Sequence, residues 1–198
     1  TPPRNAYTDS GVRIIKFRNI TNRGIEWSLN DRASVTEDFF QKHIVKRVQV
    51  GDIVVGTAAH HPRYIGAELD IVDYIPEEYQ SKVACVAEVM IIRVNPEKID
   101  PYYVLMYLRT DDGYQALQRC IRGQTAHIYP KDVRQIQISM PPEDEIDALK
   151  AIAEAMKDSL KKRRDYEKTY YGANSAFLEY INPEQSGITK PEQGTDDQ

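Results

Sequence analysis

The 198-residue sequence has little cysteine and no long apolar run. Its two cysteines, Cys85 and Cys120, form neither a disulfide framework nor a metal-ligand spacing, so we expect buried free thiols in a reducing compartment. No apolar segment approaches the roughly 18 residues that cross a bilayer, and no signal peptide opens the sequence. These absences exclude disulfide-rich secreted proteins and membrane-spanning proteins, and they favour a cytoplasmic globular protein.

Catalytic motifs are also missing. The sequence contains no Gly-x-Ser-x-Gly, no P-loop, no Cys–His arrangement and no nuclease pattern of carboxylates with a lysine. The stretch "DPYY" at residues 100–103 lacks the second proline of the amine-binding motif of amino-methyltransferases, so a helix start is favoured. His60 and His61 have no further ligand at a diagnostic spacing, so a polar loop is favoured over a metal site. We therefore expect no catalytic residue, no cofactor and no metal.

The net charge is negative, but positive charge is concentrated in two blocks. The formal net charge is −4. Residues 1–63 carry 10 basic and 6 acidic side chains, and residues 113–142 carry 4 basic and 1 acidic. The remaining segments, 64–112 and 143–198, are acidic. An uneven distribution of this kind allows a polyanionic partner despite the negative sum, although it does not by itself indicate one.

The pattern of apolar residues predicts an α/β (α+β) domain with a twisted mixed sheet. Strands are expected in "VRIIKFRNI" (12–20), after the turn at 21–27, in the apolar run 48–59, in 83–94 and in the alternating "VRQIQIS" (133–139). Residues 31–45 have partial helical spacing, and 60–79 look irregular. Asp100-Pro101 starts, and Gly123 ends, one or two further helices.

After Pro141-Pro142 the pattern changes to a long charged helix. The apolar positions Ile146, Leu149, Ala153, Met156 and Leu160 alternate in spacings of 3 and 4, which is typical of a coiled-coil-like seam. Because this seam covers only about two heptads, the helix needs something to pack on. We expect a domain at 1–142, a spacer helix at 143–181 and a disordered tail at 182–198. The start at Thr1 rather than methionine is compatible with a fragment of a longer protein.

The order of these motifs resembles one half of a type I restriction-modification specificity (S) subunit. The resemblance rests on "GVRIIKFRNITNRG", "VGDIVVG", a strand, "PYYVLMYLRT" and "RGQTAHIYPKDVRQIQISMPP" followed by the long helix, and it covers residues 10–170. It implies a DNA target-recognition domain, a helix that packs antiparallel on its counterpart, and docking of methyltransferase subunits. This chain has one recognition domain and one helix where the family has two of each. A half-subunit that forms a homodimer, or the C-terminal recognition domain of a fused adenine-N6 methyltransferase, would account for that difference.

The resemblance implies contacts with double-stranded DNA of two kinds. Side chains with paired donors and acceptors are candidates for base edges: Asn19, Asn22, Arg23, Arg122, Gln124, Thr125 and His127. Cations are candidates for phosphates: Lys16, Arg18, Lys42, Lys46, Arg47 and Lys131. We expect the turns around Gly24 and Gly123 to converge on one positively charged concave face. An alternative function of a different kind is that of a protein–protein adaptor that does not bind DNA.

Overall fold

The computed structural model describes residues 2–29, 32–43, 47–79, 82–86 and 88–182. Lys46 and the expected tail from residue 183 onward lie outside these residues. The chain divides into two compact units, Thr1–Lys157 and Asp158–Gln198. The first unit contains all the strands and the short helices, and the long helix α5 (Ile146–Ile181) starts in it and makes up the described part of the second unit. A mixed α/β fold with a mixed sheet and a long C-terminal helix is thus confirmed.

A four-stranded mixed sheet forms the N-terminal half of the first unit. Its order is β1 (Tyr7–Thr8), β3 (Ser34–Val35), β2 (Val12–Ile15) and β7 (Val83–Cys85), and only the β2–β7 pair is parallel. All four residues of β2 are buried because its two faces contribute to different cores. Val12 and Ile14 pack with Phe40 of α1 (Glu37–His43), whereas Ile15 packs in the cluster around Trp27.

A three-stranded antiparallel sheet stands beside it. Its central strand is β4 (Ile53–Gly56), which pairs with β6 (Leu69–Ile71) on one edge and β8 (Val89–Ile92) on the other. Ile53, Val54 and Val55 are fully buried, which confirms the expected strand covered on both faces. The sequence 60–79 contains β6 and is therefore less irregular than expected. The apolar run 83–94 is not one strand, because β7 and β8 join different sheets.

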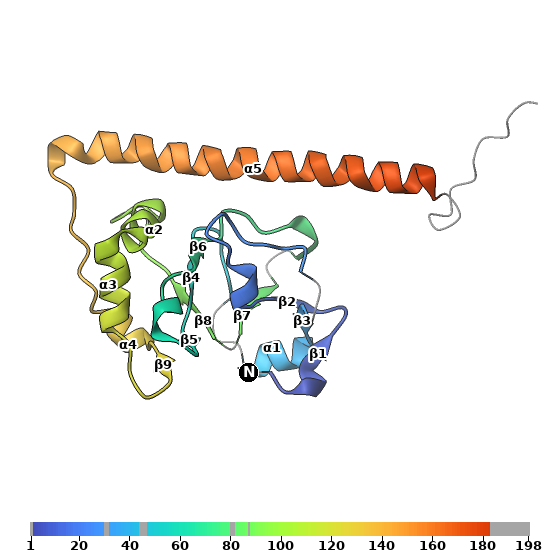
Figure 1. The fold of residues 1–198 in the computed structure, drawn as a ribbon, viewed down its shortest axis with the longest axis horizontal. Helices are drawn as coiled ribbons and strands as arrows, with labels where there is room; N and C mark the ends of the chain where they lie inside the picture. Colours follow the sequence, from blue (N-terminus) through green and yellow to red (C-terminus); the bar gives the residue numbers. More distant parts are fainter. Residues whose placement is uncertain (1, 30–31, 44–46, 80–81, 87, 183–198) are drawn as a thin grey trace, which may run out of the picture. The chain divides into compact units, whose positions relative to one another are not determined.

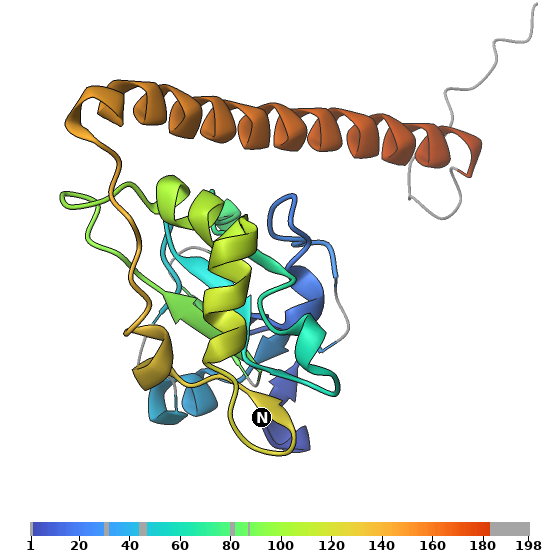
Figure 2. The same ribbon diagram turned by 60° about the vertical axis from the view of Figure 1, so that its left-hand side comes forward.

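Two consecutive helices lie on one side of the strands, opposite α1 (Figure 1). α2 (Pro101–Arg109) begins at Asp100, whose Oδ1 accepts a hydrogen bond of 2.7 Å from the backbone N–H of Tyr102. Asp100-Pro101 is thus the expected helix start. α3 (Asp111–Arg119) follows after Thr110, and Figure 2 shows it crossing in front of the strands. Gly113 permits this close succession, because a Cβ there would lie 2.1 Å from the carbonyl oxygen of Tyr107.

The expected strand at residues 133–139 is wrong. α4 (Pro130–Val133) occupies its beginning, a turn follows at residues 134–135, and residues 136–139 have no strand partner among the described residues. The hydroxyl groups of Tyr103 and Tyr107 on α2 instead donate to the carbonyl oxygens of Ser139 (2.6 Å) and Gln137 (3.3 Å). Ile136 and Ile138 alternate with exposed neighbours, as in a half-buried strand. The period of two was therefore correct for an extended segment, but the segment packs on a helix.

The long helix is α5, preceded by the acidic turn η5 (Glu143–Glu145). Its 36 residues exceed the two heptads of the expected seam. Of the five seam residues, Ala153 and Leu160 are buried, Leu149 and Met156 are half-buried and Ile146 is exposed. Within the first unit, Lys157 pairs with Asp100 at 3.3 Å and lies 5.2 Å from the ring centroid of Tyr102. These contacts tie the first three turns of α5 to the start of α2.

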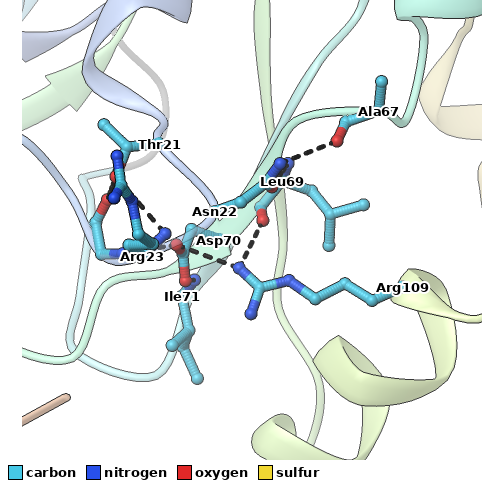
Figure 3. Close-up of polar contacts among 9 residues, drawn as sticks. Thr21, Asn22, Arg23, Ala67, Leu69, Asp70, Ile71 and Arg109 are labelled. Atoms are coloured by element: carbon cyan, nitrogen blue, oxygen red, sulfur yellow. Dashed lines mark hydrogen bonds and ion pairs between the residues drawn. The ribbon is translucent and has the colours of Figure 1, made fainter.

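A buried carboxylate joins three separate segments (Figure 3). Asp70 of β6 is fully buried and accepts hydrogen bonds from the backbone N–H groups of Gly24 and Ile71. It also forms an ion pair of 3.0 Å with Arg109, the last residue of α2, which donates in addition to the carbonyl oxygen of Leu69 (2.9 Å). Three donors thus satisfy a charge that would otherwise be costly to bury. We call this arrangement the Asp70 junction.

We predict that Asp70→Ala lowers the free energy of unfolding by about 3–5 kcal/mol, because it leaves Arg109 partly buried without its counter-charge. Urea denaturation followed by circular dichroism measures this change. The matched control is Asp38→Ala, which removes an exposed ion pair with Lys42 and should cost at most about 0.5 kcal/mol. Equal losses in the two variants would contradict a special role for the Asp70 junction.

Candidate nucleic-acid interface

A short two-stranded ribbon lies beyond the end of β4. β5 (Ala58–Ala59) pairs antiparallel with β9 (Ala126–His127), with Ala58 opposite His127. The backbone N–H of Ile128 also donates to the carbonyl oxygen of Thr57 at 2.9 Å, so the pairing continues to the end of β4. The ribbon joins two loops that are far apart in sequence, residues 60–65 and residues 120–125.

Two side chains of α3, Tyr114 and Gln118, fix the first of these loops. The side-chain amide of Gln118 donates to the carbonyl oxygens of Pro62 (3.0 Å) and Ile65 (2.6 Å). The hydroxyl of Tyr114 donates to the carbonyl oxygen of Arg63 at 2.9 Å. Three backbone carbonyls of the loop are therefore bound by one helix, and the loop is held close to the end of α3.

Exposed cations gather on these segments. Residues 58–65 and 119–134 contain five basic residues and one acidic residue, Asp132, and also three of the four histidines of the chain. We call the exposed side chains of these two segments the ribbon surface: His60, His61, Arg63, Tyr64, Arg119, Arg122, Gln124, Thr125, Tyr129, Lys131 and Arg134, together with the half-buried His127. A surface that combines cations, amides and exposed aromatic rings is suited to a nucleic acid.

An open groove of about 520 Å³ borders the ribbon surface. The end of α3 supplies Arg119 and Arg122 to its wall, and the α4 region supplies Asp132 and Gln135. Arg122 forms an ion pair with Asp132 at 3.3 Å, and these two charges cancel. The remaining charge of Arg119 makes the wall of the groove positive. Burial raises the pKa of the Cys120 thiol in the same wall, which makes the protonated form dominant.

The Arg122 side chain caps the C-terminal end of α3 and also contributes to the ribbon surface. Its Nη1 donates to the carbonyl oxygens of Arg119 (2.9 Å) and Ile121 (3.0 Å), which have no partner inside the helix. With Nη2 directed to Asp132, the guanidinium is largely engaged within the protein. Arg122 is half-exposed and contributes charge to the surface, but its bonds favour a positioning role over a bidentate base contact.

The loop after Gly123 is exposed. Gly123 has a φ of +81°, which lets the chain reverse after α3 at low conformational cost. Gln124 and Thr125 are exposed, and Nδ1 of His127 lies 2.9 Å from the carbonyl oxygen of Thr125. These three candidates for base edges are therefore available for an external partner.

Two of the three N-terminal candidates for base edges, Asn19 and Asn22, have other roles. Asn19 is buried, its Oδ1 accepts from the backbone N–H of Lys16 (2.9 Å), and its Nδ2 donates to the carbonyl oxygen of Glu26 (2.7 Å). Asn22 donates to the carbonyl oxygen of Ala67 and accepts from the N–H of Leu69, both at 3.0 Å. Its amide thus pairs with the edge of β6 as a neighbouring strand would. We assign both asparagines to the fold, while Arg23 is exposed on the same turn.

The candidates for phosphate contacts are dispersed over several elements. Lys16 and Arg18 belong to the region of η2 (Phe17–Asn19), where Phe17 packs on Gly56 at the end of β4, next to the ribbon. Lys42 pairs with Asp38 on α1 at 2.8 Å, and the guanidinium carbon of Arg47 lies 4.9 Å from the ring centroid of Phe40. Lys131 alone of these described candidates lies on the ribbon surface.

The turns around Gly24 and Gly123 were expected to share one face, and the structure places them near opposite ends of α3. Asn22 lines a pocket with Asp111 and Tyr114 at the beginning of α3, whereas Arg122 follows the end of that helix. The nine residues of α3 span about 14 Å at the usual rise per residue, so the turns lie at opposite ends of it. The beginning of α3 is acidic, with Asp111 and Asp112, and only the far end is cationic.

The sequence interpretation missed several residues of the ribbon surface. His60 and His61 were considered only as a metal site or a polar loop, and Arg63, Arg119 and Arg134 were not selected. The two alanines of β5 carry no signal for a long-range pairing with residues 126–127, because a two-residue strand has no periodicity to detect. The positive block at 113–142 and the loop "RGQTAH" were the features that pointed to part of this surface.

Neither a protein-family model nor a curated protein matches this sequence. In the described part of the chain, no group of three or more His, Cys, Asp or Glu side chains is placed to hold a metal ion. Among the same residues, no helix has both the length and the apolar character needed to cross a membrane. Both cysteines are free thiols, Cys120 buried and Cys85 half-buried.

We predict that Asn22→Gly lowers the free energy of unfolding by about 1–3 kcal/mol, because the edge of β6 loses two hydrogen bonds. Asn22→Ala should lose roughly 1 kcal/mol more, since Asn22 has a φ of +58° that alanine tolerates poorly. Thermal and urea unfolding of both variants measure these changes. If Asn22→Gly had the stability of the wild type, the structural role of Asn22 would be contradicted, and its amide would again be a candidate for binding a ligand.

Proposed function

We propose that the first unit binds double-stranded DNA through the ribbon surface and recognises its sequence as the specificity component of a type I-like restriction-modification system. The observation that carries this proposal is the concentration of five cations against one carboxylate on two loops joined by β5 and β9. Cations of this kind bind phosphates and supply most of the affinity of a DNA-binding protein. The component itself performs no catalysis and directs an adenine methyltransferase or endonuclease to the site.

Recognition of sequence requires side chains that meet base edges. Gln124 has an amide that can donate to and accept from adenine, and Thr125 has a hydroxyl and a methyl group. Both are exposed between the cations Arg122 and Lys131, so phosphate contacts on either side would orient them. The ribbon and the end of α3 hold the ends of this loop, which favours a preformed reading element.

The resemblance to specificity subunits supports the same function independently of the charge. It rests on the order of motifs from Gly11 to the long helix, and it implies that the loop "RGQTAH" faces DNA. In the alternative form of this proposal, the chain is the C-terminal recognition domain of a fused adenine-N6 methyltransferase. Both forms of the proposal require the ribbon surface to bind DNA. They differ only in whether the catalytic part is a separate subunit or a domain of the same chain.

The second unit favours a protein partner. The seam of α5 passes through the ion pair of Arg163 and Glu167 (2.7 Å) and then resumes in the same phase at Tyr170, Phe177 and Ile181. These three side chains are 50%, 60% and 48% exposed. An exposed apolar face of this size indicates an interaction site. We propose that a methyltransferase subunit or domain binds to this face of α5. The alternative is that two copies of the chain form a homodimer through it. If the protein does not bind duplex DNA, the same face supports the function of a protein–protein adaptor.

We predict that Arg119→Ala, Lys131→Ala and Arg134→Ala together weaken binding to all duplex sequences and reduce the slope of log affinity against log salt by about 2.7, or roughly 0.9 for each lost phosphate contact. Fluorescence anisotropy with labelled duplexes between low and physiological salt measures the slope. The control removes three cations from α5 instead: Lys150→Ala, Lys161→Ala and Lys162→Ala. A triple variant with the wild-type slope, or an equal loss in the control, would contradict the proposed surface.

We predict that Tyr170→Asp with Phe177→Asp abolishes association through α5 while leaving duplex affinity within about twofold, because the charges interrupt only the apolar face of the second unit. Sedimentation velocity, alone and with the methyltransferase partner, reports the assembly state. Gly172→Asp with Ser175→Asp adds the same charge to the opposite side of the helix and should retain association. Unchanged assembly in the first variant would refute the interaction site.

A further inference from the structure

The half-buried His127 is held by contacts of both its backbone and its ring. Its backbone pairs with Ala58 across the ribbon, and it exchanges hydrogen bonds with Arg122, from N–H to carbonyl at 3.3 Å and from carbonyl to N–H at 2.8 Å. Its ring stacks on Tyr129, with centroids 6.4 Å apart and planes inclined by 20°. Backbone pairing on both sides and a stacked ring leave the imidazole little freedom to reorient.

A hydrogen bond to the backbone determines which ring nitrogen carries the proton. Nδ1 lies 2.9 Å from the carbonyl oxygen of Thr125. A carbonyl oxygen only accepts, so in this bond Nδ1 is the donor, and the neutral ring has its lone pair on Nε2. Nε2 is not among the buried atoms without a partner, and no bond to it is found within the described residues. Nε2 is therefore a solvent-accessible acceptor of fixed orientation.

The groups around the ring are mainly cationic or neutral. The elements packed against it contribute Arg122 with its counter-ion Asp132, Tyr129 beneath the ring and Lys131 on α4. The ribbon partner β5 is followed directly by His60 and His61. The carboxylate nearest in sequence, that of Asp132, is already paired with Arg122, so an external donor is needed to satisfy Nε2.

We propose that His127 is a specificity-determining residue, whose Nε2 accepts a hydrogen bond from the exocyclic amino group of adenine or cytosine in the major groove. This inference rests on the proposed function. Adenine N6 and cytosine N4 are the amino donors on that face of a base pair, whereas guanine and thymine present acceptors where a lone pair would be repelled. Protonation places a hydrogen on Nε2 and turns the acceptor into a donor. The base preference at that single position must then shift toward guanine or thymine at low pH.

The experiment selects bound duplexes from a randomised pool with the full 198-residue chain, at about pH 8 and about pH 5.5. At the higher pH we expect adenine or cytosine at one position to be preferred by about tenfold, within the range for one base contact. At the lower pH this preference should disappear or invert, while the other positions keep theirs.

Three variants separate His127 from other causes. His127→Gln retains an acceptor near Nε2 and should keep the adenine or cytosine preference at both pH values, whereas His127→Ala should lose it at both. Gln124→Ala should alter a different position and keep the pH-dependent one. As a further control, His60→Ala with His61→Ala removes the neighbouring titrating groups and should weaken binding at low pH without affecting the shift in preference.

The outcomes distinguish the inference from the function on which it rests. Absence of duplex binding at any pH and low salt overturns both. Sequence-selective binding with the same preferences at both pH values, or with all preferences intact in a folded His127→Ala, overturns the role of His127 alone. A pH-dependent shift that persists in His127→Gln also overturns it, because glutamine does not titrate. Folding of each variant is verified by its thermal unfolding transition.

Discussion

The architecture of the first unit depends on one buried carboxylate. Asp70 has no contact with solvent, so its charge must be satisfied entirely by donors within the protein. One of these donors is the backbone N–H of Gly24 in the N-terminal turn, and another is the guanidinium of Arg109 at the end of α2. Because these two residues lie 46 and 39 positions from Asp70 in sequence, a single charge determines where the N-terminal turn and α2 meet the edge of β6.

The position of the ribbon surface follows from that junction. Arg109 ends α2, and α3 begins two residues later, so the end of α2 also fixes the start of α3. α3 then carries Tyr114 and Gln118, which bind the carbonyls of residues 62–65, and Arg122 closes its end. The loops that carry the cations of the surface are thus held by several hydrogen bonds to their backbone. A surface that is ordered before binding loses less entropy on binding than a mobile loop would.

Sequence patterns predicted those helices and strands that are determined by their own residues and immediate neighbours. The continuous apolar run predicted β4, Asp100-Pro101 predicted the start of α2, and the acidic turn after Pro142 predicted α5. Elements that depend on distant partners were not predictable. Residues 133–139 have the period of a strand, but tyrosine hydroxyls of α2 bind their carbonyls. Asn22 has the same turn chemistry whether its amide faces a ligand or the edge of β6, so only the fold decides between them.

The negative sum of charges does not oppose a polyanionic partner, because screening acts over shorter distances than the separation of the charged regions. At physiological ionic strength the Debye length is about 8 Å. Asp111 and Asp112 lie at the opposite end of α3 from Arg119, about 11–12 Å away along the helix axis. A phosphate on the ribbon surface therefore interacts chiefly with Arg119, Lys131 and their neighbours. At low salt the Debye length reaches about 30 Å and the acidic segments are no longer screened, so part of the attraction is offset. The affinity of such a chain should consequently rise less steeply on lowering the salt than its count of phosphate contacts alone implies.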